Sequence, residues 1–106
     1  NSRGITEIPN FWKMLANDQN ELERSWNTLK QVMRKGALDP ITKELIYVAV
    51  SITNSCEYCT KSHSYAAKKK GATDEMLKEM ISVVGLANKN NKLVDAYQVE
   101  IDELYK

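Results

Sequence analysis

Residues 39–71 read DPITKELIYVAVSITNSCEYCTKSHSYAAKKKG and carry the signals that decide the fold. Asp39-Pro40 predicts a helix start, because an acidic N-cap residue precedes a proline at the first helical position. The helix that follows, Ile41 to about Thr53, is apolar on every face between Leu45 and Val50, as expected of a buried central helix. The β-branched residues of that run also suit a buried strand. The helix start and the lack of a second good strand favour the helix.

Downstream of the Asn54-Ser55 turn, three more helical segments are predicted. The first begins around Cys56 and runs to Lys70, where Gly71 closes it. Thr73 is the N-cap of the next. Gly85 is either a break or a close helix contact, and the last segment runs from Leu86 to Leu104. The segment capped by Thr73 has an inner face of Met76, Leu77, Met80, Ile81 and Val84.

Upstream of residue 39, two helices are predicted. Pro9 opens the first, which ends near Ala16. Asp18 caps the second, which should end at Gly36, just after a basic pair. The chain of 106 residues is therefore predicted to be all-α, a single-domain bundle of about six helices over residues 1–106, with two cysteines at the start of a central helix.

Composition and charge exclude several classes of function. Lys plus Arg is 15 and Asp plus Glu is 14, so the net charge of +1 lacks the basic excess of a nucleic-acid binder. Residues 45–50 form the longest apolar run, far short of the roughly 20 residues that span a bilayer. Positions 1–20 lack the pattern of a signal peptide, and no glycine-rich phosphate loop or dinucleotide fingerprint is present. We expect a cytoplasmic protein without nucleic-acid, membrane or organic-cofactor binding.

Four residues form the one constellation with chemical promise: Glu44, Cys56, Cys59 and His63, in the pattern E-x11-C-x2-C-x3-H. The last three are spaced three and four residues apart, so they share one helix face. If the two helices are antiparallel, Glu44 faces His63 at similar depth. A disulfide between Cys56 and Cys59 would close almost no loop, so the pair serves chemistry or a metal rather than stability.

These residue types suit reduction of a hydroperoxide. His63 can take the proton of Cys59, and Glu44 can orient His63. The thiolate attacks the O–O bond and becomes a sulfenic acid, which the second cysteine condenses with to give a disulfide. A dithiol reductant then resets the site by exchange. Helix-terminus electrostatics alone would instead favour Cys56 as the more acidic thiol.

Other interpretations of the same residues remain open at this stage. The four side chains could supply a tetrahedral zinc site, although a structural zinc normally takes its fourth ligand from a second Cys or His pair, which is absent. A lone histidine is more often an ordinary residue, and an early helix glutamate such as Glu44 often only complements the helix dipole. The lysines at 68–70 are explained by the dipole in the same way.

The stretch from Ile41 to Glu75 resembles the core of the AhpD-like alkylhydroperoxidase family, within the carboxymuconolactone decarboxylase superfamily. The likeness is strongest over residues 38–87, and the pattern E-x11-C-x2-C-x3-H is reproduced without a gap. The resemblance implies an all-helical fold, homo-oligomers such as trimers or hexamers, and reaction with a hydroperoxide or disulfide substrate. It also implies an external reductant, either a dithiol protein or a small thiol.

Carried over to this sequence, the resemblance implies that Cys59 attacks the peroxide and Cys56 resolves the product. His63 corresponds to the base and Glu44 to the far end of the proton relay. Tyr58 stands where relatives often have a histidine, so an auxiliary proton transfer there is in doubt. The expected function is a thiol-dependent antioxidant oxidoreductase of the alkylhydroperoxidase or disulfide reductase type.

Two other functions are weighed against this one. A decarboxylase of carboxylactones, from the same superfamily, would not need the CxxC pair. A non-catalytic oligomeric helical module would use the stripe of the last segment as its contact surface: Leu93, Tyr97, Ile101 and Leu104.

Overall fold

The computed structural model describes residues 8–106 and is built from five α-helices and a short 3-10 helix, without a strand in that range. The all-α prediction is confirmed. The chain divides into two compact units, residues 1–35 and 36–106. The assignment of one domain to residues 1–106 stays a prediction, and each unit is described by itself.

The first unit pairs α1 (Asn10–Leu15) with α2 (Gln19–Met33). Asp18 caps α2 as predicted, because its side chain accepts a hydrogen bond from the backbone N–H of Glu21. Trp12 of α1 meets Trp26 of α2 edge to face, with ring centroids 5.1 Å apart. The end of α2 was predicted wrongly: the helix stops at Met33, and Arg34, the first residue of the basic pair, already has an extended backbone.

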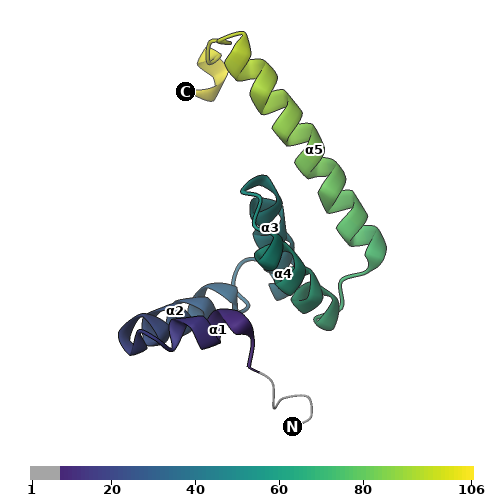
Figure 1. Cartoon of the computed structure of the whole chain (residues 1–106). Coiled ribbons are helices and arrows are strands. Elements are labelled where there is room, and N and C mark those ends of the chain that lie inside the picture. Colours follow the sequence, from purple (N-terminus) through teal and green to yellow (C-terminus); the bar gives the residue numbers. More distant parts are fainter. Residues whose placement is uncertain (1–7) are drawn as a thin grey trace. The chain divides into compact units, whose positions relative to one another are not determined.

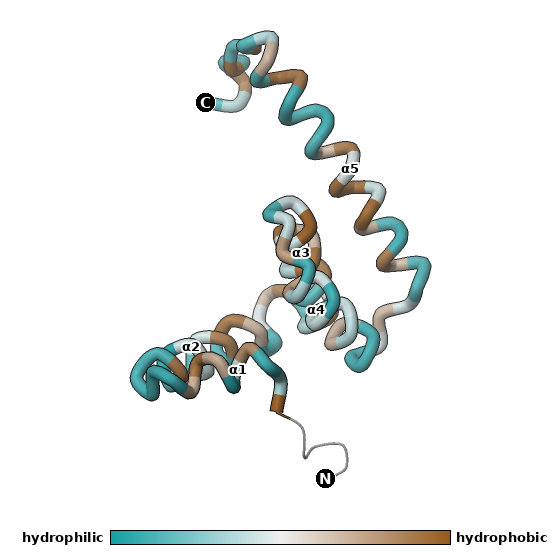
Figure 2. The backbone as a smooth tube through the Cα atoms, in the orientation of Figure 1, coloured by the Kyte–Doolittle hydropathy of each residue, from teal (hydrophilic) through white to brown (hydrophobic). Residues whose placement is uncertain are grey.

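The second unit contains α3 (Pro40–Thr53), α4 (Glu57–Lys69), α5 (Asp74–Ala96) and the 3-10 helix (Glu103–Tyr105). Helix α3 packs against both α4 and α5 (Figure 1), which fits its apolar character on every side (Figure 2). The predicted caps are present: Asp39 accepts from the N–H of Thr42, and Thr73 accepts from the N–H of Met76. The buried hydrophobic residues among those described are Val48, Ala67, Ala72 and Val84.

The turn between α3 and α4 is a Schellman motif without glycine. Ser55 has a φ of 59°, in the left-handed region. The N–H of Cys56 donates to the carbonyl of Ser51 at 2.9 Å, and the N–H of Ser55 donates to that of Ile52 at 3.1 Å. These bonds satisfy carbonyls at the end of α3 and fix the position at which α4 begins.

A second Schellman motif ends α4. The N–H of Ala72 donates to the carbonyl of Ala67 at 2.9 Å, and the N–H of Gly71 donates to that of Lys68 at 3.0 Å. Gly71 has a φ of 114°, a conformation that L side chains rarely adopt. Gly71 therefore closes α4 as predicted and sets the direction in which the preceding Lys70 leaves the helix.

Helix α5 differs from the prediction. Residues 74–96 form one uninterrupted helix, so the segment expected from Leu86 is partly the continuation of α5. Gly85 lies in its interior, and a Cβ added there would meet nothing within 4 Å, so within this chain it is neither a break nor a close contact. The second half of α5 extends past α3 and α4 (Figure 1). In the part of the chain from residue 8 on, no helix is long and apolar enough to cross a membrane.

Candidate active site in the α3–α4 helix pair

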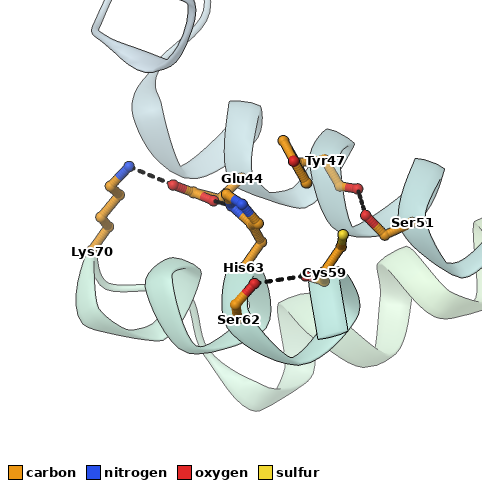
Figure 3. Close-up of polar contacts among 7 residues, drawn as sticks. All are labelled: Glu44, Tyr47, Ser51, Cys59, Ser62, His63 and Lys70. Atoms are coloured by element: carbon orange, nitrogen blue, oxygen red, sulfur yellow. Dashed lines mark hydrogen bonds and ion pairs between the residues drawn. The ribbon is translucent and has the colours of Figure 1, made fainter. Parts of the chain in front are cut away.

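Glu44 lies at the centre of the candidate site, on the face of α3 that meets α4. The residue is 3% exposed although it carries a carboxyl group. Its Oε1 lies 2.7 Å from Nδ1 of His63, and its Oε2 lies 2.6 Å from Nζ of Lys70 (Figure 3). Both partners come from the α4 side of the helix pair. The predicted facing of Glu44 and His63 is therefore present, and the contact is direct.

Two contacts hold the imidazole ring of His63, whose side chain is 19% exposed. One is the hydrogen bond to Glu44. The other is the ring of Tyr47, stacked at a centroid distance of 3.6 Å and an interplanar angle of 21°. Because a carboxylate only accepts hydrogen bonds, Nδ1 of a neutral His63 is the donor and Nε2 is left as the proton acceptor.

The two cysteines lie at the start of α4 and form a disulfide, with their Cα atoms 5.4 Å apart. Cys56 is the N-cap of α4, and its Sγ accepts a hydrogen bond from the N–H of Cys59 at 3.3 Å. Figure 3 shows that the sulfur of Cys59 and the ring of His63 both rise from α4 toward α3. The helix pair thus gathers all four residues of the predicted pattern.

Two serines lie near the cysteine pair, and the outer side of α4 carries an open hollow. Ser51 is buried and donates its hydroxyl hydrogen bond to the carbonyl of Tyr47 at 2.8 Å. Ser62 donates to the carbonyl of Cys59 at 3.3 Å. On the outer side, a shallow hollow of about 500 Å³ is lined by Glu57, Tyr58, Lys61 and Ser62, so Tyr58 forms a pocket wall.

Two carboxyl groups at the ends of these helices are electrostatically stabilised. The hydrogen bond from the backbone N–H of Thr42, together with that from its hydroxyl, lowers the pKa of Asp39 at the start of α3. The hydrogen bond and the positive charge of Lys68 lower the pKa of Asp74 at the start of α5. Both carboxylates also lie where the helix dipole favours negative charge.

The metal alternative finds no support in the geometry. Over residues 8–106, no three or more His, Cys, Asp or Glu side chains are grouped so that they could hold a metal ion. The sulfur atoms of Cys56 and Cys59 are joined to each other.

Lys70 is one of two site residues that sequence reasoning missed. The lysines at 68–70 were explained together by the helix dipole, yet only Lys70 among them contacts Glu44. Its spacing was the available signal, since residues seven apart share a helix face and Lys70 follows His63 by seven. Tyr47, whose ring stacks on that of His63, is the other missed residue. It follows Glu44 by three residues on α3, so both lie on one helix face.

A fold and site of this kind agree with the sequence comparisons. Residues 20–99 match the carboxymuconolactone decarboxylase family, and the chain belongs to that family. A crystal structure of the alkylhydroperoxidase AhpD core from Rhodospirillum rubrum superposes with a TM-score of 0.90 at 47% sequence identity. That likeness covers 93% of this chain and 74% of the Rhodospirillum chain.

The curated relatives match a smaller share of this chain than the Rhodospirillum structure does. An alkyl hydroperoxide reductase AhpD of Solibacter usitatus is 32% identical over 74 residues, which are 70% of this chain and 40% of the relative. A protein of Paracoccus denitrificans named uncharacterized protein 4 in cox locus is 44% identical over 54 residues, 51% of this chain and 49% of the relative. The matched region thus spans less than half the length of either relative. The predicted AhpD-like resemblance is confirmed.

Proposed function

We propose that this protein is a thiol-dependent oxidoreductase of the alkylhydroperoxidase type, with Cys59 as the attacking thiol. The observation that carries the proposal is the buried Glu44 carboxylate, hydrogen-bonded to His63 one helical turn after Cys59. This contact leaves Nε2 of His63 as the acceptor on the α4 face that also carries both sulfur atoms. The AhpD-named relatives support the same class of activity.

The reaction begins from the reduced pair. Nε2 of His63 takes the proton of the Cys59 thiol, and the thiolate attacks the terminal oxygen of a hydroperoxide, ROOH. The O–O bond breaks, Cys59 becomes a sulfenic acid, and the alkoxide leaves with the proton from His63 as ROH. The Cys56 thiol then attacks the sulfenic sulfur, a disulfide forms and water leaves.

The cycle closes with an external reductant. One dithiol protein, or two molecules of a small thiol, returns two electrons and two protons by disulfide exchange and is itself oxidised to a disulfide. A substrate disulfide can take the place of the hydroperoxide: exchange with the reduced Cys56–Cys59 pair oxidises the pair and releases the substrate as two thiols, which is the reductant step run in the opposite direction. Because reductants of this kind are maintained in the cytoplasm, we place the cycle there.

Mass spectrometry after one equivalent of an organic hydroperoxide tests the proposal. The reduced wild-type protein should lose two hydrogens, mapped to Cys56 and Cys59. The Cys56→Ser variant should instead gain one oxygen on Cys59, trappable by a sulfenic-acid reagent such as dimedone. The Cys59→Ser variant should show neither change.

The same variants separate this proposal from lactone decarboxylation. A decarboxylase acts by acid–base chemistry and keeps its turnover of a carboxylactone when both cysteines are replaced. Peroxide-dependent oxidation that survives in Cys59→Ser contradicts the assignment of Cys59. Carboxylactone turnover by the double cysteine variant contradicts the whole peroxidase assignment.

We further propose that copies of the chain assemble into a homo-oligomer, a trimer or hexamer. The support is one face of α5 on which the apolar residues Val83, Leu86 and Val94 are 50–63% exposed. Exposed apolar patches of this kind are typical of protein–protein contacts. Light scattering should give a molar mass that is a multiple of the monomer mass, and a monomer at all concentrations contradicts the proposal.

A further inference from the structure

We propose that Lys70 is a positioning residue of this site: its ammonium group anchors one oxygen of the Glu44 carboxylate, so that the other oxygen holds His63 with Nε2 free to accept a proton. This role rests on the proposed function, because the proton in question is that of Cys59. It gives the site an ionic partner for Glu44, which the E-x11-C-x2-C-x3-H pattern does not contain.

The division of the carboxylate between two partners is the first argument. Oε2 of Glu44 lies 2.6 Å from Nζ of Lys70, and Oε1 lies 2.7 Å from Nδ1 of His63. The Glu44 side chain is only 4% exposed, whereas that of Lys70 is 37% exposed. A buried carboxylate needs a partner charge or hydrogen bonds in place of water. Lys70 supplies the charge from the solvent side.

The local fold aims Lys70 at Glu44. Lys70 is the C-cap of α4, and the Schellman motif around Gly71 fixes its backbone. The two preceding lysines have partners of their own: Lys68 pairs with Asp74 at 2.8 Å, and Lys69 lies over the ring of Tyr65 at 5.8 Å. Lys70 is thus the member of this lysine run that serves the α3–α4 contact.

The charge of Lys70 matters for the protonation of His63. A carboxylate that lacks its own cation stabilises the doubly protonated imidazolium beside it. In that form both ring nitrogens carry hydrogen, and neither accepts a proton from a thiol. With Lys70 in place, the Glu44 charge is already balanced, and the oxygen left to His63 serves as the hydrogen-bond acceptor of Nδ1–H. Tyr47 stacks on this ring, and Cys59 rises from α4 beside it; neither residue changes in the experiment (Figure 3).

The experiment compares Lys70→Met with Lys70→Arg, and uses Lys68→Met as the matched control. His63 is the single histidine of the chain, so its ¹⁵N NMR signals need no assignment. In reduced wild type at pH 7 we expect the neutral tautomer with hydrogen on Nδ1. In Lys70→Met the signals should move toward those of the imidazolium, and kcat for hydroperoxide reduction should fall about tenfold with KM unchanged.

The controls decide between positioning and mere stability. Lys70→Arg keeps the cation and should restore the wild-type tautomer and most of kcat, and Lys68→Met should match wild type in both. In a Glu44→Gln background, Lys70→Met should cause no further loss, because the residue through which it acts is gone. Circular dichroism verifies folding, and Lys70→Gln replaces Lys70→Met if the latter does not fold.

Several outcomes overturn the inference. An unchanged His63 tautomer in Lys70→Met does so, as does a Lys70→Arg variant that fails as fully as Lys70→Met. The NMR comparison uses reduced protein without hydroperoxide, so it is independent of turnover. If wild type reduces no hydroperoxide, the proposed function fails, whereas a tautomer change in Lys70→Met still supports the positioning role.

Discussion

Polar and apolar side chains are distributed in opposite ways in the α3–α4 contact and along the second half of α5. Between α3 and α4, the polar residues Glu44 and Ser51 are buried, 3% and 5% exposed, and each has a hydrogen-bond partner. Along α5, the apolar residues Leu86 and Val94 are 60% and 50% exposed. Buried polar groups indicate chemistry, and exposed apolar groups indicate a contact surface. The comparison matches the two proposals, which assign the reaction to the helix pair and the contact between copies to α5.

The largest expected effect concerns the candidate active site between α3 and α4. In His63→Gln the side chain can no longer take a proton, so the rate of peroxide-dependent thiol oxidation should fall by about 100-fold or more. Stopped-flow measurement of thiol loss at pH 7 checks this. Leu93→Ala on α5 is the control and should leave the rate unchanged. Similar losses in both variants would mean that the α3–α4 pair has no special role.

The next effect concerns the packing of α3. Val48 is 1% exposed and Val50 is 54% exposed on the same helix. Val48→Ala should lower the free energy of unfolding by about 2 kcal/mol, because the deleted methyl groups leave a cavity. Val50→Ala is the matched control and should stay within about 0.5 kcal/mol of wild type. Urea unfolding followed by circular dichroism gives both values, and equal values would contradict the burial of α3.

A smaller effect is expected at the exposed apolar face of α5. Leu86→Glu places a charge on the exposed apolar face of α5 and should weaken self-association by about tenfold, the value of one poorly desolvated charge. Sedimentation velocity over a dilution series measures the change. Lys92→Gln changes the net charge by the same amount at an exposed position on the other side of α5 and should associate as wild type does. If both variants behave as wild type, this face is not the contact surface.

The smallest effect is a pH dependence at the start of α3. The pKa of Asp39 is lowered from its ordinary 3.8 by the hydrogen bonds from Thr42. The unfolded chain therefore binds this proton more tightly, so the stabilisation is present above pH 3.8 and is lost as the pH falls through the folded value. Asp39→Asn keeps an N-cap that does not titrate. Its urea midpoint should fall less than that of wild type between pH 6 and pH 2.5, and Glu100→Gln should follow wild type.

Local rules predicted the fold class and most helix starts. Asp18, Asp39 and Thr73 cap helices as expected, because a capping side chain bonds a backbone N–H only three residues away. The approach of Glu44 to His63 also followed from spacing, since two antiparallel helices joined by a short turn bring such positions together. Signals confined to a few residues were therefore sufficient for these features.

Features that depend on longer-range geometry were missed. Gly85 costs a helix only about 1 kcal/mol, so the flanking good helix formers carry α5 through it, and no local signal decides this. The end of α2 before Gly36 was likewise not marked by its sequence. Lys70 was missed because the direction of its side chain is set by the turn at Gly71 and by the position of α3, neither of which is a property of the lysine run.

Cys56 belongs to two motifs at once. Its N–H completes the end of α3 by bonding Ser51, and its Sγ caps the start of α4 by accepting from Cys59. The eleven residues between Glu44 and Cys56 therefore determine how Glu44 is placed relative to the start of α4. Adding or deleting one of them would rotate Glu44 away from the imidazole of His63 and remove the sulfur of Cys56 from the start of α4. Substitutions in this stretch are therefore compatible with the site, whereas a change in its length is not.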